Sequence, residues 1–133
     1  MEALGRHLIL EYHGCCASEL DDIEFLENTI LEATRATRAT IVHSHFHRYA
    51  PQGVSGAVVI SESHVTIHTW PEFGYMAADV FTCGESVDPW AFHHQLLKTI
   101  RVERTSSVEL RRGLLDVPKS EIPQSYDATT IHD

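Results

Sequence analysis

The feature that most constrains the fold is the hydrophobic period, which switches between strand and helix spacing along the chain. Apolar residues recur at helical spacing over residues 20–34, where Ser18 and Asp21 are expected to cap the first turn. Asp88-Pro89 predicts the start of a second helix that runs to about Arg101. The remaining apolar segments read as six strands, at residues 6–13, 41–49, 54–60, 65–70, 75–82 and 108–111.

The predicted order is strand, helix, four strands, helix, strand, with most strands joined by hairpins. This order predicts an α+β fold, a two-layer α/β sandwich with a mostly antiparallel sheet and two helices on one face. The other sheet face must be polar or covered, and a dimer that packs sheet against sheet is one solution. We expect a single domain over residues 1–117 and a polar, flexible C-terminal tail over residues 118–133.

Charge and cysteine content exclude several classes of protein. Lys and Arg total 10 against 19 acidic residues, for a net charge of -9, so we expect no nucleic-acid partner and a weak preference for cationic ligands. No apolar run reaches membrane-spanning length, and no signal peptide is visible, so we expect no membrane partner. Three cysteines, two of them adjacent, favour reduced thiols and a cytoplasmic location.

Glu62-Ser63-His64 lies between two predicted strands, where backbone strain is plausible. A serine hydroxyl here could attack the preceding carbonyl, shift the acyl bond from nitrogen to oxygen, and leave a pyruvoyl group after elimination and hydrolysis. His64 and His68 are nearby bases, and Ser55 is a nearby hydroxyl. On three residues alone, a polar turn is the simpler interpretation.

The segments around Glu62-Ser63-His64 favour a self-cleavage site over a simple polar turn. They are Arg6-His7, Phe46-His47-Arg48, Gly53-Val54-Ser55-Gly56, Ser61-Glu62-Ser63-His64, His68-Thr69-Trp70-Pro71-Glu72 and Phe81-Thr82-Cys83-Gly84-Glu85. In this order and spacing, they closely resemble the prokaryotic type of S-adenosylmethionine decarboxylase, a pyruvoyl-dependent, self-cleaving proenzyme. The resemblance covers roughly Leu4 to Gly113.

The resemblance implies cleavage between Glu62 and Ser63, which gives a β chain of residues 1–62 and an α chain of residues 63–133. Ser63 resembles the residue that becomes the pyruvoyl group, which forms a Schiff base with the substrate amine. Ser55 and His68 look like the pair that assists processing, and Cys83 looks like the general acid.

The resemblance also implies a substrate site and an assembly. Glu72 resembles the carboxylate that holds the ribose hydroxyls, and Trp70 and Tyr49 look like walls for the adenine or sulfonium. Position 49 departs from the expected phenylalanine but keeps an aromatic face. The family forms homodimers with sites near the subunit interface, and it makes decarboxylated S-adenosylmethionine, the aminopropyl donor of polyamine synthesis.

Physical chemistry supports these assignments separately. A thiol such as Cys83 titrates near enough to neutrality to give a proton, and a sulfonium is attracted to aromatic faces. A pyridoxal phosphate enzyme needs a Schiff-base lysine, but Lys98 and Lys119 are the only lysines and lie in none of these segments. We therefore expect no pyridoxal phosphate.

Three alternatives stay open at this point. The same machinery could act on arginine or ornithine, or the chain could be an unprocessed, non-catalytic binding dimer with Ser63 intact. His43, His45 and His47 share one strand face and could bind a metal, but their spacing matches no closed zinc motif, so we expect no metal.

Overall fold

The computed structural model describes residues 2–121, and its strands follow the predicted order. The elements are β1 (Glu2–His13), α1 (Ala17–Leu20), α2 (Ile23–Ala36), β2 (Ile41–Arg48), β3 (Val54–Ile60), β4 (Ser63–Trp70), η1 (Pro71–Phe73), β5 (Tyr75–Cys83), α3 (Trp90–Thr99), β6 (Arg104–Leu115) and η2 (Lys119–Glu121). Most of the tail predicted over residues 118–133 lies outside the described residues.

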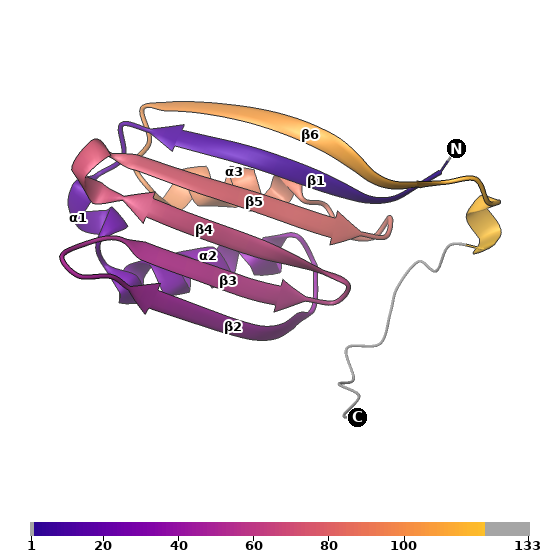
Figure 1. Ribbon diagram of the computed structural model, residues 1–133, viewed down its shortest axis with the longest axis horizontal. Coiled ribbons are helices and arrows are strands. Elements are labelled where there is room, and N and C mark those ends of the chain that lie inside the picture. Colours follow the sequence, from indigo (N-terminus) through magenta and orange to yellow (C-terminus); the bar gives the residue numbers. More distant parts are fainter. Residues whose placement is uncertain (1, 122–133) are drawn as a thin grey trace.

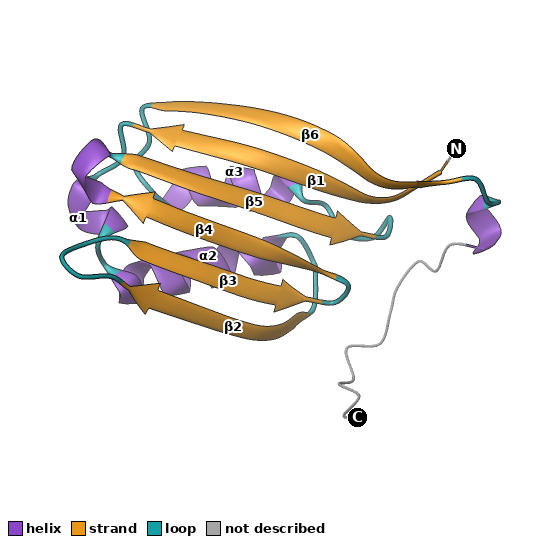
Figure 2. Cartoon of the chain, viewed as in Figure 1, coloured by secondary structure: helices purple, strands orange, loops and turns teal. Residues whose placement is uncertain are grey.

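One six-stranded sheet in the order β2-β3-β4-β5-β1-β6 forms the first layer, and every neighbouring pair of strands is antiparallel. Helices α2 and α3 lie side by side behind the sheet (Figures 1 and 2). The predicted α+β two-layer sandwich, with its helices on one face, is therefore confirmed. Within the described part of the chain, no helix is long and apolar enough to cross a membrane.

The core lies between the sheet and the helices, because alternate residues of each strand point toward α2 and α3. A fully buried leucine or isoleucine contributes roughly 1.5–3 kcal/mol relative to an exposed one. Tyr12 and His93 form a polar pair within this layer, with 2.8 Å between the phenol oxygen and Nδ1. The largest fully buried apolar side chains include Leu8, Leu10, Leu20, Leu26, Ile30, Ile60, Ile67, Met76, Phe92 and Leu96.

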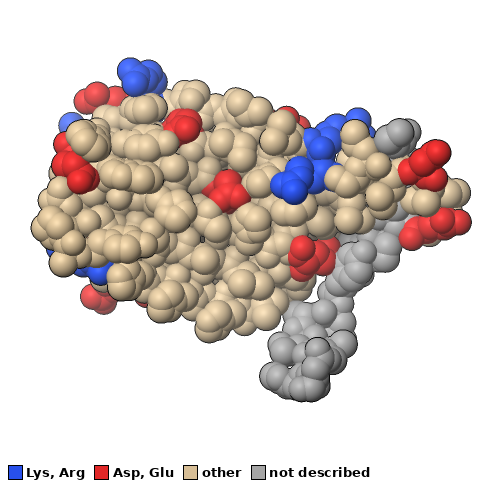
Figure 3. Space-filling model, viewed as in Figure 1, with Lys and Arg blue, Asp and Glu red and all other residues tan. Residues whose placement is uncertain are grey.

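The face of the sheet that faces away from the helices is called the open face here. Three apolar side chains on it are strongly exposed, Val59 at 46%, Val108 at 55% and Leu110 at 46%. Figure 3 views this face and shows few charged side chains across the sheet. A weakly charged sheet face with exposed apolar side chains is suited to contact with another surface.

Two local predictions were wrong. Ser18 and Asp21 do not cap one long helix: a short α1 ends at Leu20, and Asp22 caps α2 by accepting a hydrogen bond of 3.0 Å from the Phe25 amide. The last strand was predicted over residues 108–111, but β6 continues through Gly113, whose φ of 66° allows a local kink, after which Leu114 pairs with Ala3 of β1.

Candidate active site

A two-residue turn between β3 and β4 holds the predicted cleavage site. Glu62 has a φ of 82°, a left-handed conformation that costs a residue with a Cβ atom about 1–3 kcal/mol. This φ is typical of the third position of a type II turn, where glycine is preferred. Backbone strain is therefore stored in the residue whose carbonyl group precedes Ser63.

Ser63 begins β4 and faces Cys83, the last residue of β5. The Ser63 Oγ and Cys83 Sγ atoms are 3.3 Å apart, and Cys83 is 9% exposed. Gly5 of β1 pairs with Cys83, and a Cβ atom at Gly5 would lie 2.9 Å from the sulfur and 2.7 Å from the Thr82 carbonyl oxygen. The absence of a side chain at Gly5 thus makes room for the thiol beside Ser63.

Two hollows flank the strained turn. One is lined by residues of the segment before β2 and of the β5–α3 connection, together with Glu62 and Cys83. The other encloses about 530 Å³, which is within the range of small-molecule sites. Its lining residues are Val59, Ile60, Glu62, Ser63, His64, Phe81 and Arg112. The Glu62-Ser63 peptide is thus reachable by a small molecule from the open face.

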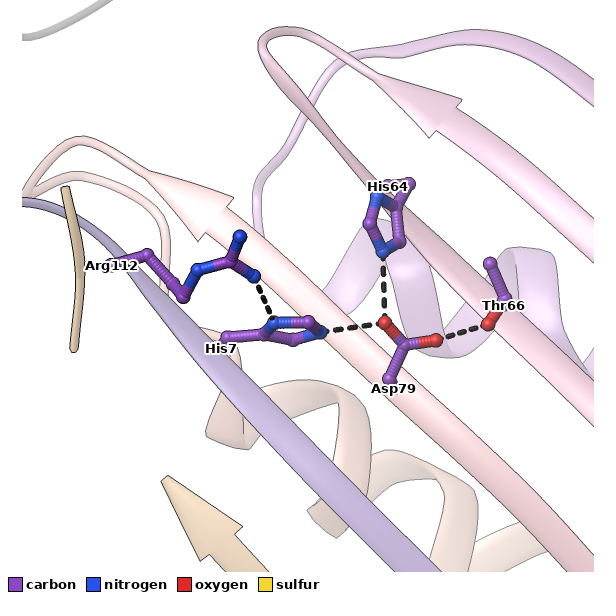
Figure 4. A network of polar contacts seen from close by, with 5 residues as sticks. All are labelled: His7, His64, Thr66, Asp79 and Arg112. Atoms are coloured by element: carbon purple, nitrogen blue, oxygen red, sulfur yellow. Dashed lines mark hydrogen bonds and ion pairs between the residues drawn. The ribbon is translucent and has the colours of Figure 1, made fainter. Parts of the chain in front are cut away.

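A network of polar side chains adjoins the second hollow (Figure 4). The Asp79 carboxylate accepts hydrogen bonds from His7 Nε2 at 2.6 Å, from His64 Nε2 at 2.8 Å and from the Thr66 hydroxyl. Burial acts to raise the pKa of Asp79, but the hydrogen bonds from Thr66, His7 and His64 outweigh it and hold the pKa below its usual value. Asp79 is therefore ionised at neutral pH.

Arg112 completes this network from β6. Its guanidinium group donates to His7 Nδ1 at 2.9 Å and lies 5.0 Å from the centre of the Phe81 ring. The His7 ring also stacks on the Phe81 ring, with 5.1 Å between ring centres. Arg112 therefore holds the His7 ring from its Nδ1 side, while Asp79 holds it from its Nε2 side.

His7, His64 and Asp79 form the one group of three potential metal ligands found among residues 2–121. Both histidines direct Nε2 at the carboxylate, and Arg112 occupies Nδ1 of His7. Because the ring nitrogens that converge there carry protons donated to Asp79, they offer no lone pair to a metal. The donor set fits a hydrogen-bond network rather than a metal centre. The sequence candidates His43, His45 and His47 form no such group.

The opposite end of the open face carries the other predicted site residues. Ser55 of β3 pairs with His68 of β4, and the Ser55 Oγ and His68 Nδ1 atoms are 2.8 Å apart. Trp70 is 40% exposed and stacks on Tyr75 with 5.3 Å between ring centres. Glu72 is exposed on η1, immediately after Trp70. We call this set of residues the aromatic end.

Tyr49 belongs to the same end and is 48% exposed. It lies in the loop between β2 and β3, where its amide donates to the Gly53 carbonyl at 2.8 Å. Asp21 anchors this loop by accepting from the Gly53 amide at 2.9 Å and from Arg48 at 2.7 Å. Hydrogen bonds from Gly53 and then Arg48 lower the pKa of Asp21. The loop geometry is thus held by a carboxylate that stays ionised.

The structure brings Ser63 and Cys83 together but separates them from the aromatic end. Ser63 lies opposite Ile60, whereas His68 lies opposite Ser55, five residues further along β4. At about 3.4 Å per residue, the two ends are roughly 17 Å apart within one chain. Ser55 and His68 of one chain therefore do not reach Ser63 of the same chain.

Sequence reasoning did not identify Asp79, Thr66 or Arg112 as site residues. The sequence feature that could have indicated this network is Asp79 itself, the one charged residue in the segment Tyr75–Thr82. A charged residue inside a strand usually has a partner. Its partners come from β1 and β4, and Arg112 of β6 joins through His7, so only the sheet order reveals the network.

Comparison with known proteins identifies the family of the chain. The family model for S-adenosylmethionine decarboxylase matches residues 6–113. The S-adenosylmethionine decarboxylase proenzyme of Thermosipho melanesiensis is 53% identical over 116 residues, which cover 87% of this chain and 89% of that protein. The proenzyme of the same name from Caldanaerobacter subterraneus is 48% identical over 118 residues, covering 89% and 95%.

A solved structure shows the same fold. The crystal structure of the adenosylmethionine decarboxylase from Aquifex aeolicus superposes with a TM-score of 0.82 at 27% identity, covering 90% of this chain and 98% of that one. The family predicted from the sequence segments is thereby confirmed. The chain belongs to the S-adenosylmethionine decarboxylase family.

Proposed function

We propose that this chain is a proenzyme that cuts itself between Glu62 and Ser63 and then decarboxylates S-adenosylmethionine. The observation that carries the proposal is the strained Glu62 followed directly by a serine hydroxyl in contact with a thiol. Relatives that are 48–53% identical bear the name of such a proenzyme.

The cleavage step uses this chain's own atoms. The Ser63 Oγ attacks the Glu62 carbonyl carbon, and the acyl group moves from the Ser63 nitrogen to its oxygen. Elimination then removes the Ser63 Cα proton to a base, breaks the Cβ–Oγ bond, releases the Glu62 carboxylate and leaves a dehydroalanine. This tautomerises to an imine, which water hydrolyses with loss of ammonia. The strain at Glu62 favours this acyl shift, because breaking the Glu62–Ser63 peptide bond lets Glu62 leave the left-handed conformation.

The residues around Ser63 fit a pyruvoyl group at the new N-terminus. No lysine lines either hollow, so a carbonyl group made from the chain itself is the available partner for a substrate amine. Such a carbonyl supplies an electron sink for the pair left behind when carbon dioxide departs. The Cys83 thiol lies close enough to donate a proton to the substrate carbon afterwards.

The aromatic end supports a cationic nucleoside as the substrate. Exposed Trp70 and Tyr49 offer ring faces to a sulfonium, and Glu72 offers a carboxylate to ribose hydroxyls. Arginine and ornithine lack both an adenine ring and a ribose, so they would leave these groups unused. S-adenosylmethionine is therefore the preferred substrate.

We infer further that the active unit is a homodimer in which open faces pack together. The two ends of the site are roughly 17 Å apart in one chain, so Ser55 and His68 of a second copy would complete the site at Ser63. Exposed Val59, Val108 and Leu110 supply an apolar contact surface on the same face. A cytoplasmic location remains a prediction, supported by three free thiols.

Mixed dimers test this arrangement. Co-expression of Ser63→Ala and His68→Asn chains gives some dimers in which an intact Ser63 meets an intact His68 from the other chain. We expect about half of the His68→Asn chains to be cut, from the random 1:2:1 assortment of two chains in a C2 dimer. No cutting beyond that of His68→Asn alone would contradict assistance between subunits.

Carbon dioxide release tests the substrate. The purified, cleaved protein is supplied separately with S-adenosylmethionine, arginine and ornithine, each labelled in the carboxyl carbon. We expect release from S-adenosylmethionine, with arginine and ornithine at background. Release from arginine or ornithine alone would show that the proposed substrate is wrong, although the proposal of self-cleavage would stand.

A further inference from the structure

Asp79 is a partly buried charge in the middle of β5, and both of its carboxylate oxygens accept hydrogen bonds. Three donors from two other strands converge on its two oxygens, and its side chain is 22% exposed. An ionised carboxylate is an acceptor only, so each neighbour must present a proton to it. Asp79 therefore dictates where the hydrogens of the two adjacent histidine rings lie.

The tautomer of each ring follows from counting donors. Arg112 can only donate, so His7 Nδ1 accepts and the His7 proton sits on Nε2, facing Asp79. His64 Nε2 also faces Asp79 and must carry a proton. In the neutral His64 ring, Nδ1 is thus left with its lone pair.

The position of His64 connects this network to the cleavage site. His64 directly follows Ser63 and lines the same hollow as Glu62 and Ser63. Among the residues that line this hollow, His64 is the sole histidine. His68, the base named from the family resemblance, lies roughly 17 Å from Ser63 along its own strand.

We propose, building on the function proposed above, that His64 Nδ1 accepts the Ser63 hydroxyl proton during self-cleavage and that Asp79 is the positioning residue that fixes the required His64 tautomer. The Oγ–H bond breaks as Oγ forms its bond to the Glu62 carbonyl carbon, and the proton passes to Nδ1. When the carbon–nitrogen bond breaks, that proton goes to the Ser63 nitrogen. His64 ends neutral, and Asp79 stays ionised throughout.

The groups that face His64 come from every neighbouring strand. Asp79 and Phe81 lie on β5, His7 and Arg112 on β1 and β6, and uncharged Val59 opposite His64 on β3. His43 of β2 lies beyond Val59.

The test measures self-cleavage instead of decarboxylation. Chains are made by pulsed in vitro translation, and the rate of cutting is followed from about pH 5.5 to about pH 8.5, the range in which histidine loses its proton. The wild-type rate should rise with pH to a plateau. Asp79→Asn should lower the plateau about 10- to 100-fold, because an amide can donate to His64 Nε2 and stabilise the other tautomer.

His64→Ala supplies a second and independent readout. Cutting should slow by about 10²- to 10⁴-fold and lose its dependence on pH in this range, and added imidazole should restore at least about tenfold. Imidazole can enter because the hollow beside Ser63 is open to solvent. His94→Asn, an exposed histidine on α3, is the matched control and should cut at the wild-type rate.

The outcomes separate this proposal from the proposed function. An Asp79→Asn rate and pH profile equal to wild type, or a His64→Ala rate that imidazole does not raise, would overturn the proposal while cleavage at Ser63 stands. A wild-type chain that never cuts would remove the proposed function itself. If Asp79→Asn fails to fold by thermal unfolding in a Ser63→Ala background, the imidazole experiment decides alone.

Discussion

The cleavage end and the aromatic end of the open face differ in how completely one chain builds them. At the cleavage end, strands β1, β4, β5 and β6 fix a strained peptide, a thiol and a hydrogen-bond network around Asp79. At the aromatic end, Tyr49, Trp70 and Glu72 stand exposed around the Ser55–His68 pair.

This difference shows that preorganisation is concentrated where covalent chemistry on the chain must start. Self-cleavage needs its groups in place before any substrate binds, so the network and the strain are internal to the fold. Binding groups can wait for a ligand or a second subunit, so they are left accessible. Variants of the groups that bind substrate should therefore change substrate affinity, whereas variants of the groups that assist cleavage should change cutting.

Ser63→Ala should give the largest effect, at the cleavage end. Without the hydroxyl there is no nucleophile, so cleavage and decarboxylation should both vanish, and gel electrophoresis should show one intact 15.0 kDa chain. Ser55→Ala removes a hydroxyl at the other end and should slow cutting without abolishing it. Normal cutting of Ser63→Ala would refute the nucleophile assignment.

Cys83→Ala should separate turnover from cleavage. Loss of a general acid typically costs about 10²- to 10⁴-fold in rate, so carbon dioxide release should fall by that amount while cutting at Ser63 largely persists. The partly exposed thiol of Cys16 provides a control, since Cys16→Ala should leave both rates unchanged. Unchanged turnover in Cys83→Ala would remove Cys83 from the mechanism.

Trp70→Ala should act at the aromatic end alone. Loss of a cation–π contact worth about 1–2 kcal/mol predicts a KM for S-adenosylmethionine about 5- to 30-fold higher, with the rate of self-cleavage unchanged. Trp70→Phe keeps a ring face and should recover most of the affinity. A slowed cleavage step with unaltered KM would show that Trp70 acts in cleavage and not in substrate binding.

Asp79→Asn should give the smallest effect, on stability, measured by urea unfolding in the uncleaved Ser63→Ala background. The pKa of Asp79 is depressed in the folded state, so its ionised form stabilises the fold above about pH 4 and this contribution is lost as pH falls further. The variant should be less stable by about 1–2 kcal/mol at neutral pH, with the difference closing in acid. A constant difference across pH would contradict this account.

Local patterns predicted much of the fold because hairpin-linked strands leave few alternative topologies. Residues 54–60 were assigned to the strand that the structure shows, and Asp88 binds the Trp90 amide at 3.0 Å, as expected near a helix start. The break between α1 and α2 was missed, because Asp21 turns away from the helix to hold the β2–β3 loop. That contact depends on tertiary structure and leaves no mark in local spacing.

The site was predictable only in part, and for the same reason. Ser63 and Cys83 stand in recognisable segments, and the structure brings them within 3.3 Å. The Asp79 network joins four strands through single residues, none of which is distinctive alone. The distance between Ser63 and His68 depends on strand register, which sequence spacing did not reveal.

Intact-mass spectrometry of the purified wild-type protein tests the central claim most directly. Self-cleavage predicts two chains, residues 1–62 and residues 63–133, with the second lacking a normal N-terminal amine because Ser63 has become a pyruvoyl group. A single chain with the full mass of 15.0 kDa and an unmodified Ser63 would contradict the account.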